Sequence, residues 1–169
     1  MVDVEKIGAK ALGYDKYSGC SQSVLLALQE AFDIGDQESF RAATVLSGGV
    51  ARRGETCGAL LGGLMALGLV YGRDDIRDTQ AYRDAMKPAN EIVDEFKRRL
   101  GEAFGFDEPL DSTICRDIQR RIYGRSFDLN NPEDYPMFIE AGGHGDDGCP
   151  KTCAIATEVT AEKLKELLR

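Results

Sequence analysis

Residues 48–71, GGVARRGETCGALLGGLMALGLVY, predict the element around which the chain folds. They begin as a glycine-rich loop with two arginines, Arg52 and Arg53, and continue from residue 56 as an almost uncharged apolar run. That run is too short and too rich in glycine to span a bilayer. A helix that is apolar all round must be covered on all sides, and glycines in a helix are tolerated mainly where neighbours press on its backbone. We therefore predict a buried helix over residues 56–71.

The remaining sequence is also helical in pattern, because apolar residues recur at helical spacing and strand signals are nearly absent. A long stretch, residues 73–101, contains Pro88, which should kink or divide it. Residues 125–148 form a long irregular segment, of the kind that is usually functional or mobile. The sequence predicts a compact all-α bundle, with residues 1–169 forming one domain. Its helices are expected at residues 2–12, 20–32, 38–46, 56–71, 73–101 and 112–123, and from residue 149 to near the C-terminus.

Composition narrows the classes of function. The formal net charge is −8 and the sequence pI about 4.7, which argues against nucleic acid or an anionic membrane as the partner. The sequence shows neither a signal peptide nor a transmembrane run, so a cytoplasmic protein is expected. Five cysteines in a reducing compartment favour metal binding or catalysis over structural disulfides. A single histidine, His144, excludes a metal site built from several histidines of one chain.

The cysteines share one local context. Cys20, Cys57, Cys115 and Cys149 each lie at or near a predicted helix start, and Cys153 follows Cys149 by one helical turn. Helix N-termini stabilise anions and lower thiol pKa values. Several such ends directed at one place would form a thiolate-rich pocket for an iron–sulfur cluster, a soft metal or a dithiol redox centre. The alternative is that these cysteines are small buried apolar residues.

The same residues resemble a known family. A lone Cys20 ahead of an apolar helix, the block CGALLG that starts at Cys57, then Cys115 and a C-terminal cysteine pair are similar to the redox-active family named for its pattern, C_GCAxxG_C_C. The resemblance runs from about residue 19 to residue 153. A similar domain in split-Soret cytochromes binds an iron–sulfur cluster through cysteines. The resemblance therefore implies a redox or cluster-binding role and no particular substrate.

The sequence departs from the family pattern at two places. The pattern has Gly-Cys-Ala, whereas here Thr56 precedes Cys57 and Gly58 follows it. The fifth cysteine leaves open whether Cys149 or Cys153 is the last family position.

Two redox functions follow from this reading. In the first, Cys20, Cys57, Cys115 and one of Cys149 or Cys153 ligate an iron–sulfur cluster or another metal for electron transfer, and the remaining thiol stays nearby. In the second, the chain is a thiol–disulfide oxidoreductase that uses Cys149 and Cys153, with Cys57, and no metal. If the cysteines share a function, Cys57 must lie close to the Cys149–Cys153 turn, with residues 125–148 as a lid.

A third reading is non-enzymatic: a metal-binding or electron-transfer module that docks on a redox partner. An acidic surface suits a basic partner, although no sequence feature identifies one, and a homo-oligomer stays open.

Two further groups have weaker signals. His144, with Asp146 and Asp147 beside Cys149, could supply zinc ligands, although solvated turn residues are the simpler interpretation. Arg52 and Arg53 could hold an anion at the start of the following helix, although a solvated loop is the simpler interpretation.

Overall fold

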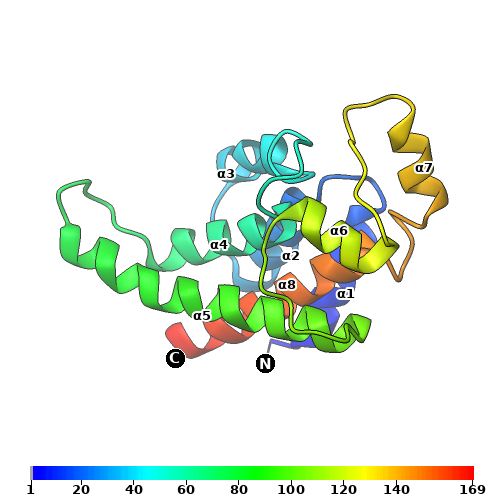
Figure 1. Cartoon of the computed structure of the whole chain (residues 1–169). Helices are drawn as coiled ribbons and strands as arrows, with labels where there is room; N and C mark the ends of the chain where they lie inside the picture. Colours follow the sequence, from blue (N-terminus) through cyan, green and yellow to red (C-terminus); the bar gives the residue numbers. More distant parts are fainter. Residues whose placement is uncertain (1) are drawn as a thin grey trace.

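Eight α-helices and one 3-10 turn build the fold in the computed structural model, which describes residues 2–169 (Figure 1). Thr56 and Ile114 form one isolated antiparallel bridge, and no strand occurs among residues 2–169, so the predicted all-α class is confirmed. None of the helices in this range is both long and apolar enough to cross a membrane. The helices are α1 (Val4–Asp15), α2 (Cys20–Phe32), α3 (Gln37–Ala42), α4 (Gly58–Tyr71), α5 (Thr79–Phe104), α6 (Cys115–Tyr123), α7 (Asp134–Glu140) and α8 (Cys149–Leu167), and η1 (Ala43–Leu46) is the 3-10 turn.

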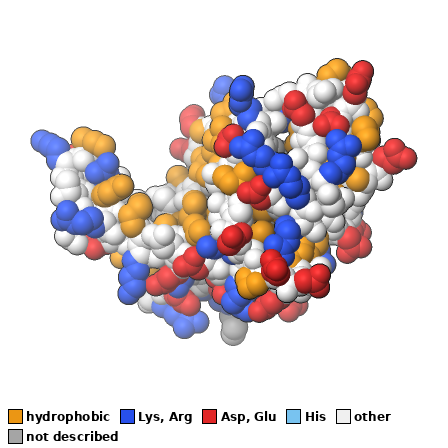
Figure 2. Space-filling view, viewed as in Figure 1, with side chains coloured by type: hydrophobic (Ala, Val, Ile, Leu, Met, Phe, Trp, Pro, Cys, Tyr) orange, Lys and Arg blue, Asp and Glu red, His pale blue; other side chains and the backbone are white. Residues whose placement is uncertain are grey.

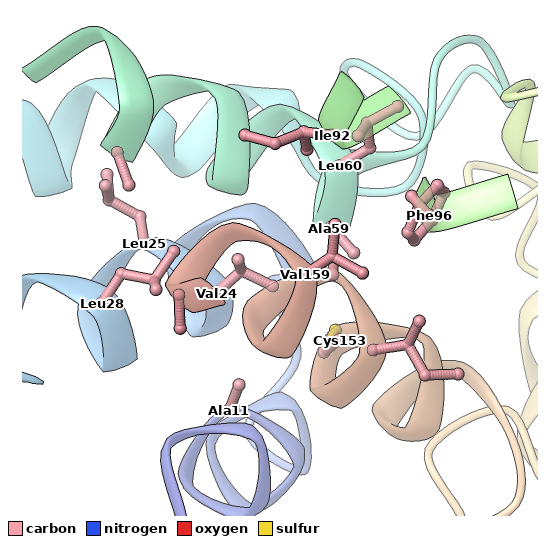
Figure 3. Packing of buried hydrophobic residues seen from close by; sticks show 14 of the residues in the cluster. Ala11, Val24, Leu25, Leu28, Ala59, Leu60, Ile92, Phe96, Cys153 and Val159 are labelled. Carbon is pink, nitrogen blue, oxygen red and sulfur yellow. The ribbon is translucent and has the colours of Figure 1, made fainter. Parts of the chain in front are cut away.

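The core forms where α8 packs against α1, α2, α4 and α5 (Figure 3). Leu25 and Leu28 of α2, Leu60 of α4, Phe96 of α5 and Val159 of α8 are all nearly inaccessible to solvent. Burying such side chains stabilises the fold by roughly 1.5–3 kcal/mol each. The last helix in the sequence therefore packs between the first ones, and this brings its first residue, Cys149, near the starts of α2, α4 and α6.

The glycines of α4 allow its neighbours to approach its backbone. A Cβ at Gly62 would collide with the carbonyl oxygen of Ser21 in α2, and one at Gly63 would collide with the hydroxyl of Thr160 in α8. The first part of α4 is covered as predicted, but its end is not, because Leu69 and Tyr71 are each 41% exposed. There α4 leaves the body and forms a projecting arm with the start of α5 (Figure 1).

Several boundaries differ from the sequence prediction, and α5 in particular begins at Thr79 rather than at residue 73. The helix expected over residues 38–46 is divided into α3 and η1. Pro88 does not divide α5, which continues through it over 26 residues, because Ile92, Phe96 and Leu100 bury one continuous face. The irregular segment 125–148 contains the short helix α7, which begins two residues before Pro136. Pro136 therefore lies in the first turn of α7, where a missing amide hydrogen costs little.

Candidate functional site: a cavity lined by four thiols

The starts of four helices meet in one cavity, and each of them carries a cysteine. Cys20, Cys115 and Cys149 are the first residues of α2, α6 and α8, and Cys57 directly precedes α4. All four line a cavity with about 630 Å³ of empty space, counting its open mouth. All five cysteines of the chain are free thiols. The placement at helix starts was predictable, whereas the convergence of these starts is a property of the tertiary structure.

Cys57 and Cys115 are aligned by a short backbone ladder. The amide of Cys57 donates to the carbonyl of Thr113 at 2.8 Å, and the amide of Cys115 donates to the carbonyl of Glu55 at 2.6 Å. Gly58 brings the third thiol close, since a Cβ at this position would lie 2.5 Å from Sγ of Cys20. A side chain at residue 58 would displace the Cys20 sulfur and press on the carbonyl oxygen of Leu46, which would lie 2.9 Å from the added Cβ.

The glycine-rich loop before Cys57 makes a left-handed turn. All residues from 48 to 52 have positive φ angles, and Val50, Ala51 and Arg52 adopt them without being glycine, at 58°, 53° and 60°. The left-handed conformation costs a non-glycine residue roughly 1–2 kcal/mol. The turn is held by backbone bonds such as that from the amide of Ala51 to the carbonyl of Val45, at 2.7 Å. Strain of this kind gathers at functional sites, and here it carries Arg52 to the edge of the cavity.

Backbone amides offset part of the effect of burial at two of the cavity thiols. The amide of Gly48 acts to lower the pKa of Cys20, and the amides of Leu60 and Ala59, at the start of α4, act to lower the pKa of Cys57. The amides of Ala59 and Leu60 are among those that have no partner within a helix at its N-terminus.

Side chains of α6 donate to the other two sulfurs. Nε2 of Gln119 lies 3.9 Å from Sγ of Cys115, and the hydroxyl of Tyr123 lies 3.4 Å from Sγ of Cys149. The same hydroxyl accepts the amide of Cys149 at 2.9 Å. Amide or hydroxyl groups near all four cavity thiols would thus stabilise a sulfur carrying negative charge, which is how proteins tune metal-bound thiolates.

Burial nevertheless raises the pKa values of all five thiols. It raises the pKa of Cys149 from an ordinary value of 9.0 to about 12, against the lowering by the Tyr123 hydroxyl. Burial also raises the pKa values of Cys20, Cys57, Cys115 and Cys153. The sequence predicted that helix starts would lower these pKa values. The amides do act in that direction at Cys57, but desolvation outweighs them.

Cys153 lies outside the cavity. Its side chain is fully buried in the core beside α2, and its thiol donates to the carbonyl of Cys20 at 3.9 Å (Figure 3). The structure therefore places Cys57 and Cys149 at one cavity and leaves Cys153 behind the cavity wall. The two C-terminal cysteines do not present their thiols to the same space.

Asp15 and His144 also line the cavity, and nothing in the sequence indicated Asp15. Asp15 ends α1 with 1% of its surface exposed, and its Oδ2 lies 3.2 Å from Nδ1 of His144. Its Oδ1 has no hydrogen-bond partner within residues 2–169. His144 packs its ring edge against Phe138, so it is not the solvated turn residue that the sequence suggested.

The zinc alternative finds no support in this geometry. Asp146 points to solvent and pairs with Lys16. No three Cys, His, Asp or Glu side chains of the described chain are close enough to hold a single metal ion.

Residues 125–148 form one side of the cavity. Leu129, Tyr135 and Phe138 of this segment line the cavity. The left-handed turn reaches the segment by four contacts. The Arg52 guanidinium lies 5.0 Å from the centre of the Tyr135 ring and 3.4 Å from the carbonyl of Leu129. Nδ2 of Asn130 donates to the carbonyl of Ala51 at 3.0 Å and to that of Arg52 at 3.4 Å. We call these contacts the mouth latch. Arg53, the neighbouring arginine, does not line the cavity.

Comparison with known proteins adds one finding. The family model described as "Putative redox-active protein (C_GCAxxG_C_C)" matches residues 18–167, which is nearly the whole chain. No curated protein and no solved structure matches the chain. The four cavity cysteines and the fifth, Cys153, all fall within the matched range.

Proposed function

The chain belongs to the redox-active family C_GCAxxG_C_C, and from this premise we propose that it is an electron-transfer protein whose cavity holds an iron–sulfur cluster. The proposed ligands are the thiolates of Cys20, Cys57, Cys115 and Cys149. Such a cluster takes up and releases single electrons. Cys149, rather than Cys153, is then the last cysteine of the family pattern.

The observation that carries this proposal is the arrangement of four thiols around one cavity, with side-chain donors at the sulfurs of Cys115 and Cys149. Four cysteine thiolates are the commonest ligand set of iron–sulfur clusters. The cavity is mostly apolar and covered by residues 125–148, so it would shield such a group from water. Raised thiol pKa values fit a site that is completed by metal, because binding of the metal displaces the thiol protons.

The residues around the thiols have separate tasks in this scheme. The amides of Gly48, Ala59 and Leu60 and the hydroxyl of Tyr123 orient the sulfurs and offset their negative charge. Gly58 leaves room for Sγ of Cys20. The mouth latch keeps the cover closed.

Anaerobic reconstitution with iron and sulfide tests the proposal. The wild-type protein should become brown and contain iron and acid-labile sulfide, and Cys57→Ser and Cys149→Ser should lose most of both. Cys153→Ala is the matched control, since its thiol does not line the cavity, and it should keep the cluster. A colourless, iron-free wild-type protein after repeated reconstitution would refute the proposal.

The metal-free alternative predicts a different result in the same samples. A thiol–disulfide oxidoreductase would stay colourless and lose two titratable thiols on mild oxidation. Among the C-terminal thiols only Cys149 faces Cys57, so the bond would join these two residues after a movement of the chain. The high thiol pKa values make this reading the weaker one, because the thiolate is the attacking species.

A further inference from the structure

An arginine groove lies directly outside the wall of the thiol cavity. It is lined by Arg52, Arg53 and Arg116 and by a single acidic residue, Asp128. Its empty space is about 830 Å³. Figure 2 shows Lys and Arg side chains gathered over α6 and the loop before α4, on the face where this groove lies. The chain as a whole carries a net charge of −8, so the positive charge lining the groove is opposite in sign to the net charge of the chain.

Much of the positive charge in the groove is uncompensated. Arg116 pairs with Glu55 at 2.9 Å. Arg52 and Arg53 are exposed and have no carboxylate within ion-pair distance in the part of the chain that the structure describes. Two adjacent exposed arginines without acidic partners leave a local positive field that attracts a negatively charged surface.

The groove and the cavity share one thin wall. Arg52 lines both of them. Cys115 and Arg116 are consecutive at the start of α6, and the first lines the cavity while the second lines the groove. Their amides donate to the carbonyls of Glu55 and Gly54, at 2.6 and 3.2 Å, so a single layer of backbone separates the two spaces. A molecule in the groove would be one residue away from a cavity sulfur.

We propose that the arginine groove is the docking site of an acidic electron-carrier protein, which exchanges one electron with the cavity through the wall at Cys115 and Arg116. This inference rests on the proposed redox function and adds the kind of partner and the point of contact. The step moves one electron from the reduced carrier to the cavity group, and no bond is formed or broken. Weak electron-transfer encounters bury little surface, and complementary charge mainly sets their association rate.

The net charge alone suggested a basic partner rather than an acidic one. An acidic chain suits a basic partner only if its charge is evenly spread, and here the surface beside the thiols is basic. An electron carrier responds to the charge at the point of contact, because salt screens charges that lie more than about 8–10 Å away.

Two measurements test the docking site on the full chain. The first is the rate at which an acidic flavodoxin in its hydroquinone state reduces the cluster-loaded protein. The second is binding of a short poly-L-glutamate peptide to the metal-free protein. Arg53→Glu combined with Arg116→Glu should slow the flavodoxin reaction at least about tenfold at low salt and weaken peptide binding, and both effects should fade at high salt.

The control variant is Arg83→Glu combined with Lys87→Glu. It replaces two exposed cations of α5, which lie far along the chain from the groove, and so changes the net charge by the same amount as the groove variant. It should leave both measurements near the wild-type values. Because Arg116 pairs with Glu55, Arg53→Glu alone serves as a second groove variant that breaks no ion pair, and it should give part of the effect.

A small cationic reductant, the methyl viologen radical, separates this inference from the proposed function. It should reduce the loaded groove variants without loss of rate. If viologen reduces neither the wild-type protein nor the variants, the proposed redox function is refuted. Peptide binding to the metal-free protein tests the groove independently of that result. Equal losses in the control variant, or unchanged rates and peptide binding in the groove variants, would overturn the docking site.

Discussion

Asp15 and His144 are separated by 129 residues in the chain, yet Oδ2 of the first lies 3.2 Å from Nδ1 of the second at the edge of the thiol cavity. The pair joins the end of α1 to the loop before α8. It also places an acidic side chain next to the thiols: after burial itself, the negative charge of Asp15 is among the causes that raise the pKa values of Cys20, Cys57 and Cys149.

Replacing Asp15 by Asn should make the cavity thiols more reactive. Removing the negative charge lowers the pKa values of these thiols, and each pKa unit changes the thiolate fraction tenfold. We expect Cys20 and Cys149 of the metal-free protein to react with iodoacetamide roughly 3- to 10-fold faster at a pH of about 8.5. Peptide mass spectrometry gives the rate at each cysteine. Asp146→Asn, at an exposed aspartate of the neighbouring loop, is the control, and equal rates in both variants would contradict the electrostatic role of Asp15.

Breaking the mouth latch should expose the cavity without unfolding the protein. Asn130→Ala removes the donor to the carbonyls of Ala51 and Arg52, and the shorter of these two bonds is worth about 1 kcal/mol. Opening of residues 125–148 should then become about fivefold more frequent, and thiol labelling at neutral pH should accelerate by the same factor. Asn90→Ala is the matched control, because its amide donates to a carbonyl on the outer face of α5. Labelling that accelerates equally in both variants would show that the latch does not close the cavity.

Two glycines of α4 should respond to alanine in opposite directions. Gly68 has nothing within 4 Å of an added Cβ, so Gly68→Ala should stabilise the helix by roughly 1 kcal/mol. At Gly62 the Cβ would collide with the backbone of α2, so Gly62→Ala should destabilise the fold by roughly 1–3 kcal/mol. Urea unfolding of the two variants measures both values. A stabilised Gly62→Ala variant would mean that α2 and α4 are not in close contact.

The metal-free protein should lose stability in alkali. The pKa of Cys149 is about 12 in the folded chain and near its ordinary value of 9.0 when unfolded, so between these values the unfolded chain has released a proton that the folded chain retains. Stability is therefore complete below about pH 9 and falls as the pH rises toward 12, by up to about 1.4 kcal/mol per pH unit for each such thiol. Urea unfolding over this range measures the slope, which should be shallower in Cys153→Ala. A flat profile would show that the thiols are not buried as described.

The apolar run of α4, the helical spacing of Val24, Leu25 and Leu28, and the lack of strand signals were enough to predict an all-helical chain. The sequence also placed Cys20, Cys57, Cys115 and Cys149 at helix starts. Both results follow from local physics, because the helical period and the helix-start signals lie within a few residues of one another in the chain. The prediction that Pro88 would kink or divide its helix considered only the local cost of a missing hydrogen bond. The packing of α5 against α8, which keeps the helix continuous, depends on residues far away in the chain.

Only the tertiary structure decided which of these local features meet. Cys149 and Cys153 are one helical turn apart, yet Cys149 lines the cavity and Cys153 is buried in the core. The packing of α8 against α1, α2 and α4 determines which side of its first turns faces the other helix starts. Asp15 and the Arg52 contacts could not be found from the sequence for the same reason. A residue's position in its helix is fixed by its neighbours in the chain, whereas its partners in a site are fixed by which helical faces bury the most apolar surface together.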